Sequence, residues 1–87
     1  MTAISTRTRA LSLYRQLLRA AVKMPTPNRQ NYVKNKTRSE YRANMDLTDK
    51  EEIEFQIRLA DTNLDTVLVQ ADHLTKLFED PNYRNDL

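Results

Sequence analysis

A regular repeat of apolar residues in the C-terminal half of this 87-residue chain strongly constrains its fold. The repeat alternates steps of four and three residues through Ile53, Ile57, Ala60, Leu64, Val67, Ala71, Leu74 and Phe78. Such steps keep side chains on one face of an α-helix, so we predict one long packed helix, about 45 Å at 1.5 Å per residue. Thr48 is its expected N-cap, with Glu51 completing a capping box. Pro81 is expected to end it.

Two shorter helices are predicted before the long one. The first runs roughly from Thr6 to Lys23, with Ser5 or Thr6 as its cap, and the second roughly from Arg29 to Met45. The two prolines at positions 25 and 27 separate them, because a proline disfavours helical geometry in the residue before it. The chain contains no glycine and no strand-like alternation. The expected fold is therefore all-α, a three-helix antiparallel bundle with a long third helix.

The shorter helices have thinner apolar faces than the third. The stripe expected on the first comprises Leu11, Tyr14, Leu18 and Ala21, widened by Leu17 and Val22. The stripe expected on the second comprises Val33, Thr37, Tyr41 and Met45, with Tyr32 to one side. We expect one domain over residues 1–80 and a polar tail over residues 81–87. A domain this small, without cysteine for disulfides, is expected to need a partner to complete its core.

Charge is divided unequally along the chain. Residues 1–39 contain nine Lys and Arg and no acid, whereas all twelve acids lie in residues 40–87 beside five bases. Lys34, Arg38 and Arg42 are spaced by four and so share one helix face, and Arg15 and Arg19 do the same on the first helix. This distribution predicts an N-terminal docking face for an anionic partner.

The sequence disfavours an enzyme and favours a binding protein. His73 is the only histidine, there is no cysteine, and no carboxylates cluster at catalytic or metal-ligand spacing around it. We expect a structural or interface role for His73. Nucleic-acid binding through Lys34, Arg38 and Arg42 is the main rival, but it is disfavoured by the net charge of +2 and the lack of a nucleic-acid motif. No apolar run reaches the roughly 20 residues that span a bilayer.

One short motif connects these features to a known family. Leu13-Tyr14-Arg15 lies in an Arg- and Leu-rich first helix, and Glu40-Tyr41-Arg42-Ala43-Asn44 follows about 26 residues later, then Leu47-Thr48-Asp49. Over roughly residues 7–78 this arrangement resembles the mitochondrial LYR-motif family. Tyr41 stands where Phe is commoner in that family. The first 24 residues are also acid-free and amphipathic, which is typical of mitochondrial targeting segments.

The resemblance implies a non-catalytic three-helix adaptor that binds the mitochondrial acyl carrier protein. It implies no cofactor of its own, but a partner-borne acylated 4'-phosphopantetheine whose acyl chain inserts between the three helices. By the match to family positions, the carrier-binding residues are Arg7, Tyr14, Arg15, Arg38 and Arg42. From helix phase, the expected acyl-chain lining is Leu17, Ala21, Val33, Ile57, Ala60 and Leu64, and ordinary core packing is the alternative for each. Ala60 and Ala71 in particular either allow close helix packing or leave a slot.

The resemblance leaves the larger assembly open. An accessory subunit or assembly factor of a respiratory-chain complex, with complex I preferred, is one expectation. A protein that stabilises the cysteine desulfurase of iron–sulfur cluster synthesis is a second, although Met45 occupies a position that is often basic in that branch. A component of mitoribosome assembly that contacts RNA is a third. In each case the expected location is the mitochondrial matrix or the matrix side of the inner membrane.

Overall fold

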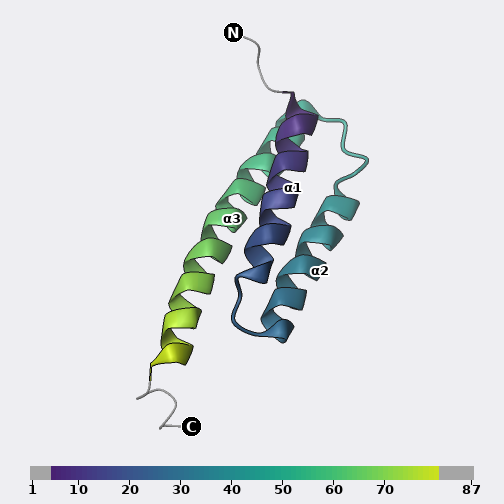
Figure 1. Ribbon diagram of the computed structural model, residues 1–87. Helices are drawn as coiled ribbons and strands as arrows, with labels where there is room; N and C mark the ends of the chain where they lie inside the picture. The colour runs from purple at the N-terminus through teal and green to yellow at the C-terminus, as the bar shows by residue number, and fades with distance from the viewer. Residues whose placement is uncertain (1–4, 81–87) are drawn as a thin grey trace.

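The computed structural model describes residues 5–80, which form three α-helices and no strand (Figure 1). They are α1 (Thr6–Val22), α2 (Pro27–Ala43) and α3 (Lys50–Glu79). The chain runs along α1, returns along α2 and then runs along α3, so α2 is antiparallel to both others. This arrangement confirms the predicted all-α bundle with a long third helix. Residues 1–4 and the predicted tail at 81–87 lie outside the described residues.

The helix ends are set by side-chain caps. Ser5 caps α1 by accepting a hydrogen bond from the Thr8 N–H at 3.2 Å, as predicted. Thr26 caps α2, which begins at Pro27 instead of Arg29. Proline suits the first helical position, because its fixed φ is helical and the N–H that it lacks would have no partner there. The α2 helix accordingly starts and ends two residues earlier than predicted.

The predicted cap of α3 is wrong by one residue. Asp49, not Thr48, is the N-cap, and its carboxylate accepts a hydrogen bond from the Glu51 N–H at 3.3 Å. Asp is at least as good an N-cap as Thr, and its negative charge also lies at the positive end of the helix dipole. The other end agrees with the sequence, since α3 stops at Glu79, two residues before Pro81.

The predicted seam of α3 forms the centre of the core. Ile57, Leu64 and Ala71 are buried, and the other seam residues are partly buried. The upper part of the core joins Ile57 and Leu64 to Leu13, Leu17 and Ala20 of α1. The lower part joins Ala71 to Ala21, Met24 and Val33. The α1 helix therefore packs against both neighbours, whereas α2 and α3 barely touch.

The predicted stripe of α1 was placed too far round the helix. Its buried residues are Leu13, Leu17, Ala20 and Ala21, whereas Leu11 and Val22 are exposed. Leu17 and Ala21 of the predicted stripe are buried as expected, and because α1 packs against both α2 and α3, Leu13 and Ala20 are buried as well. Met45 was also wrongly assigned to the stripe of α2: it lies beyond the end of that helix and is 72% exposed. No helix within residues 5–80 combines the length and hydropathy that a membrane span needs.

Candidate functional site

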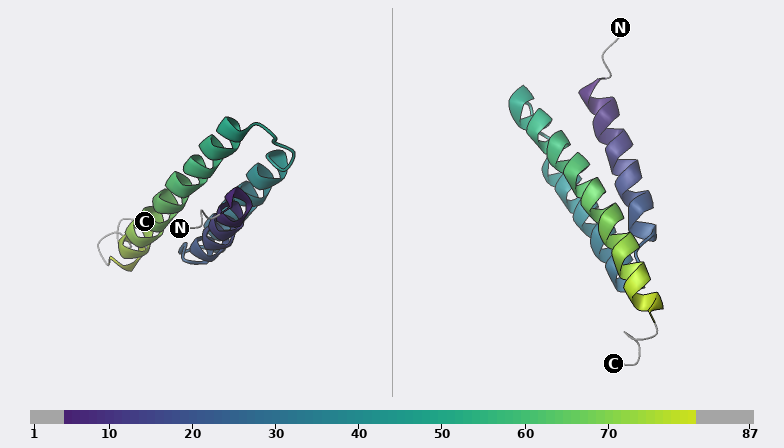
Figure 2. Two further views of the ribbon diagram at one scale, coloured as in Figure 1. Left: turned by 90° about the horizontal axis from the view of Figure 1, so that it is seen from above. Right: turned by 90° about the vertical axis from the view of Figure 1, so that its left-hand side faces the viewer.

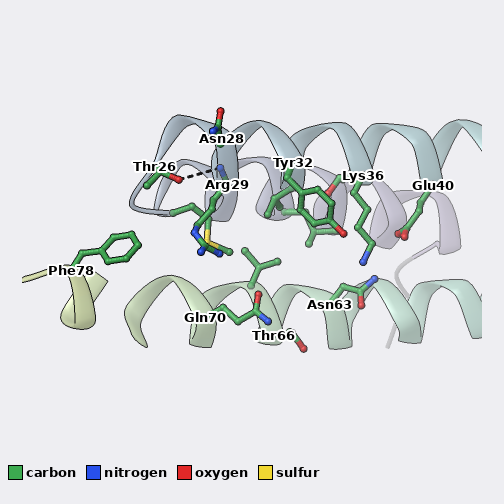
Figure 3. Close-up of a pocket in the computed structure, with 15 residues that line it drawn as sticks. Thr26, Asn28, Arg29, Tyr32, Lys36, Glu40, Asn63, Thr66, Gln70 and Phe78 are labelled. Carbon is green, nitrogen blue, oxygen red and sulfur yellow. Dashed lines mark hydrogen bonds between the residues drawn. The ribbon is translucent and has the colours of Figure 1, made fainter. Parts of the chain in front are cut away.

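The weak contact between α2 and α3 leaves a groove with α1 at its base. Its larger part is a cavity of about 690 Å³ (Figure 3). Leu17, Val33 and Val67 contribute apolar surface to it. Lys36 and Glu40 extend from α2, and Asn63 and Gln70 from α3, into the space between these helices. This part therefore has an apolar base and a polar rim.

A second cavity of about 300 Å³ lies where α1 begins and α2 ends. Its lining is largely apolar and includes Ala10, Leu47, Ile53 and Ala60. One part of its wall is fixed by the Asn44 amide, which donates to the Gln56 side-chain oxygen at 3.2 Å. Glu40 and Asn63 line both cavities, so the two cavities are neighbours. We call the two cavities together the α2–α3 groove.

Five of the six predicted acyl-lining residues are buried core residues, and four of the six also line a cavity. Leu17 and Val33 line the larger cavity, and Ile57 and Ala60 line the smaller one. Ala21 and Leu64 line neither cavity and are buried in the core. The structure thus brings four of the six predicted residues to one groove. Occupation of that groove by an acyl chain stays a prediction.

Two tyrosines hold α1 and α2 together beside the smaller cavity. The rings of Tyr14 and Tyr41 lie 4.8 Å apart between centroids, at an interplanar angle of 58°. The Tyr41 hydroxyl donates a hydrogen bond to the Ala10 carbonyl oxygen at 2.8 Å. Tyr14 is half-buried, so its role here is to pack between helices. These contacts place the LYR tripeptide next to the end of α2.

The predicted carrier-binding arginines lie around this tyrosine contact. Arg15 and Arg42 directly follow Tyr14 and Tyr41, and Arg38 is one turn before Arg42. All three are exposed, and the ion pair between described side chains, Lys76–Asp72, involves no base of α1 or α2. Arg7 is exposed as well and lines the smaller cavity. We call Arg7, Arg15, Arg38 and Arg42 the basic face; of these four, Arg7 lines the apolar smaller cavity.

Replacing Tyr41 with Phe is expected to lower the free energy of unfolding by about 0.5–1.5 kcal/mol, because the hydrogen bond to Ala10 is lost. Urea denaturation at pH 7 measures this difference. An unchanged midpoint would show that the hydrogen bond contributes nothing to stability.

The same substitution is expected to change the alkaline limit of stability. Burial, and secondarily the neighbouring Tyr14, raises the pKa of Tyr41 above its ordinary value of 10.0. Folding thus favours the protonated phenol. The resulting stabilisation is complete below pH 10.0 and is lost as the pH rises through the higher pKa of the folded protein. Tyr41→Phe should lose less stability over that range, as denaturation curves on both sides of pH 10.0 would show.

The described residues contain no arrangement typical of catalysis or metal binding. No three His, Cys, Asp or Glu side chains within residues 5–80 gather where they could hold a metal ion. His73 is exposed on α3 and belongs to neither cavity. The chemical character of the site is thus an apolar groove with a cationic border, which suits an amphiphile whose polar end is anionic.

Known proteins are similar to this chain over most of its length. Residues 8–66 match the protein family described as Complex 1 protein (LYR family). The chain is similar to LYR motif-containing protein 4 homologs of Drosophila subobscura and Drosophila melanogaster, each 39% identical over 68 residues, which cover 78% of this chain and 74% of the relative. It is 34% identical over 74 residues to LYR motif-containing protein 4 of Taeniopygia guttata, with 83% of each chain covered.

Proposed function

The chain belongs to the LYR family of small adaptor proteins, and from that premise we propose that it binds an acylated acyl carrier protein. The observation that carries this proposal is the position of Arg7, a base of the basic face that also lines the apolar smaller cavity. One ligand that joins an anionic surface to an apolar chain would use both features at once. An acyl carrier protein has this chemistry, since its acidic helices carry a fatty acyl group on phosphopantetheine.

The groove gives the acyl chain a direction in this proposal. The carrier docks on the basic face, and the acyl chain enters the smaller, more apolar cavity past Ala10 and Ala60. It continues between Glu40 and Asn63 into the larger cavity, where Leu17 and Val33 contribute to the apolar base. The half-buried Ala60 is important on this path, because its small side chain leaves the passage open. The polar rim then faces solvent above the chain.

Reversing two charges of the basic face tests carrier docking. Arg38→Glu with Arg42→Glu should weaken binding of an acylated carrier by about ten- to a hundredfold at low salt, because attraction to the acidic helices becomes repulsion. Isothermal titration calorimetry at two salt concentrations measures the loss. The matched control is Lys23→Glu with Lys76→Glu, which changes the net charge equally at the other end of the bundle. Equal affinities for the two double variants would contradict the proposed docking face.

The adaptor's client is, in this proposal, a larger mitochondrial assembly. The description of the matched family points first to respiratory complex I, for which the chain would be an accessory subunit or assembly factor. A protein that stabilises the cysteine desulfurase of iron–sulfur cluster synthesis is the alternative. Affinity purification from mitochondria, with intact-mass analysis of the carrier and identification of the other proteins, separates the two. Recovery from a mitochondrial fraction would also test the proposed location in the matrix or at the matrix side of the inner membrane.

RNA binding during mitoribosome assembly makes a different prediction from carrier binding. The bases of α1 and α2 would contact phosphates, so the affinity would fall log-linearly with salt concentration. It would not depend on an acyl group. Binding that requires the acylated carrier supports the adaptor, whereas binding to RNA that is indifferent to acylation supports the rival.

A further inference from the structure

A second row of uncharged residues runs along α3, on the side away from α1. Its members alternate steps of four and three residues: Phe55, Leu59, Thr62, Thr66, Val69 and His73. Each follows a residue of the core seam by two positions, and two positions turn a side chain by about 200° around a helix. The row therefore lies nearly opposite the core seam. We call it the outer seam.

No described residue covers the outer seam. Phe55, Leu59 and Val69 are 52%, 42% and 69% exposed, and the other three members are exposed as well. Figure 2 shows α3 along one side of the bundle, with α1 and α2 on the other. The seam runs from Phe55 to His73, which is about 27 Å of helix. A row of this length is long enough for several turns of a second helix.

The hydroxyl donors of the two threonines of the outer seam already have acceptors within α3. The Thr62 hydroxyl donates to the Arg58 carbonyl oxygen at 3.1 Å, and the Thr66 hydroxyl donates to the Thr62 carbonyl oxygen at 3.0 Å. Both donors are satisfied within α3, so a partner that covers them leaves no hydroxyl proton without an acceptor. Apart from His73, the seam has no titratable side chain to desolvate.

The flanks of the outer seam carry a defined charge pattern. If the seam occupies the a and d positions of a coiled coil, the g positions are Glu51, Arg58, Asp65 and Asp72. The e positions are the amides Gln56, Asn63 and Gln70. One flank thus carries three acids and one base, with Asp72 paired to Lys76 at 3.0 Å, and the other flank is neutral. A helix that complements this surface needs an apolar seam with Lys or Arg beside it.

We propose that the outer seam docks one amphipathic α-helix of a partner protein, with an apolar seam and basic flanking residues. This proposal goes beyond carrier binding and does not depend on it. Leu59 and Thr66 of the outer seam also line the α2–α3 groove, so the docked helix would lie along the α3 rim of that groove. A second copy that packs antiparallel on the same seam is a poorer occupant, since the acidic rows of both copies would then face each other. The chain would in this way hold an anionic partner on one side and a cationic helix on the other.

Two synthetic helical peptides test the proposal on the full chain. Both have the same apolar a and d residues; one has Lys at its e and g positions and the other has Glu. Fluorescence anisotropy should show that the Lys peptide binds at least about tenfold more tightly than the Glu peptide, with the difference shrinking in high salt. Equal binding of both peptides, or no binding of either, would overturn the charge complementarity on which the proposal depends.

Variants of the seam locate the binding site. Phe55→Gln with Val69→Gln should lower the affinity for the Lys peptide by at least about tenfold, because the double substitution removes two exposed apolar side chains without a change of charge. The matched control, Val22→Gln with Leu68→Gln, alters two exposed apolar residues outside the seam and should bind normally. Circular dichroism checks that all variants keep their helices. Unchanged binding by the seam variant would overturn the assignment, as would self-association of the unmodified chain that this variant abolishes.

A photo-crosslinking residue at position 69 can identify the protein segment that binds the outer seam in cell extract. The cross-linked segment should show apolar residues at four- and three-residue steps with Lys or Arg beside them. A segment without that pattern would overturn the proposal. Since no carrier takes part in the peptide assay, its failure leaves carrier binding standing.

Discussion

Binding of a tetradecanoyl carrier protein is expected to stabilise this chain by several kcal/mol more than binding of an octanoyl carrier. The two acyl chains differ by six methylenes, and each buried methylene contributes about 0.8 kcal/mol, which gives about 5 kcal/mol if all six enter the groove. Small domains are stable by only about 5–15 kcal/mol in total, so this difference is large for an 87-residue chain. Thermal unfolding of the complexes, with chain length as the variable, measures it.

A variant with a narrowed groove provides the control for this series. Ala60→Phe places a large ring in the lining of the smaller cavity, between α1 and the linker that follows α2. The carrier's acidic helices could still reach Arg38 and Arg42, which are exposed. We therefore expect weak binding that no longer increases with acyl length. If the unmodified protein gains the same stability from a carrier without an acyl group, the groove does not hold the acyl chain.

The groove itself could not be found from the sequence, although several of its residues were. The spacing of apolar residues along each helix correctly predicted that Leu17, Val33 and Ile57 face the interior. It could not distinguish a residue that faces a cavity from one that faces a neighbouring helix. That distinction depends on the separation between α2 and α3, which is set by how both pack on α1. Leu64, one step along the same seam from Ala60, meets α1 and is core for that reason.

The errors in the shorter helices have a related cause. Leu13 and Ala20 are buried outside the predicted stripe of α1, because α1 packs against two helices. Thr48 and Glu51 fit the capping-box pattern in the sequence, whereas Asp49 caps α3 in the structure. The buried face of α3 was predicted correctly, because eight apolar residues in regular steps of four and three leave little freedom in which face is buried. The outer seam could not be predicted from the sequence, because two of its members are threonines and the sequence does not show that their hydroxyls have acceptors within α3.

Replacing Leu64 with Ala is expected to lower the free energy of unfolding of the free chain by about 2–5 kcal/mol, the usual cost of a cavity left in a packed core. Leu64 is buried with Leu13, Leu17 and Ile57 at the centre of the bundle, and it lines neither cavity. Urea denaturation measures the loss. Should the variant be unfolded when free, the milder Ile57→Val, with an expected loss of about 0.5–1.5 kcal/mol, keeps the comparison measurable.

The decisive comparison for Leu64 is between the free chain and its complex with a tetradecanoyl carrier. A core residue that does not touch the acyl chain should cost the same stability in both states, so Leu64→Ala should leave carrier affinity nearly unchanged. Val33 lines the larger cavity and is the matched case: Val33→Ala should cost more in the complex, because it also removes surface that the acyl chain contacts. A loss of affinity with Leu64→Ala that equals the loss with Val33→Ala would mean that the acyl chain enters the bundle deeper than the groove, between α1 and α3. The two substitutions thus separate the part of the apolar interior that folds the protein from the part that binds the acyl chain.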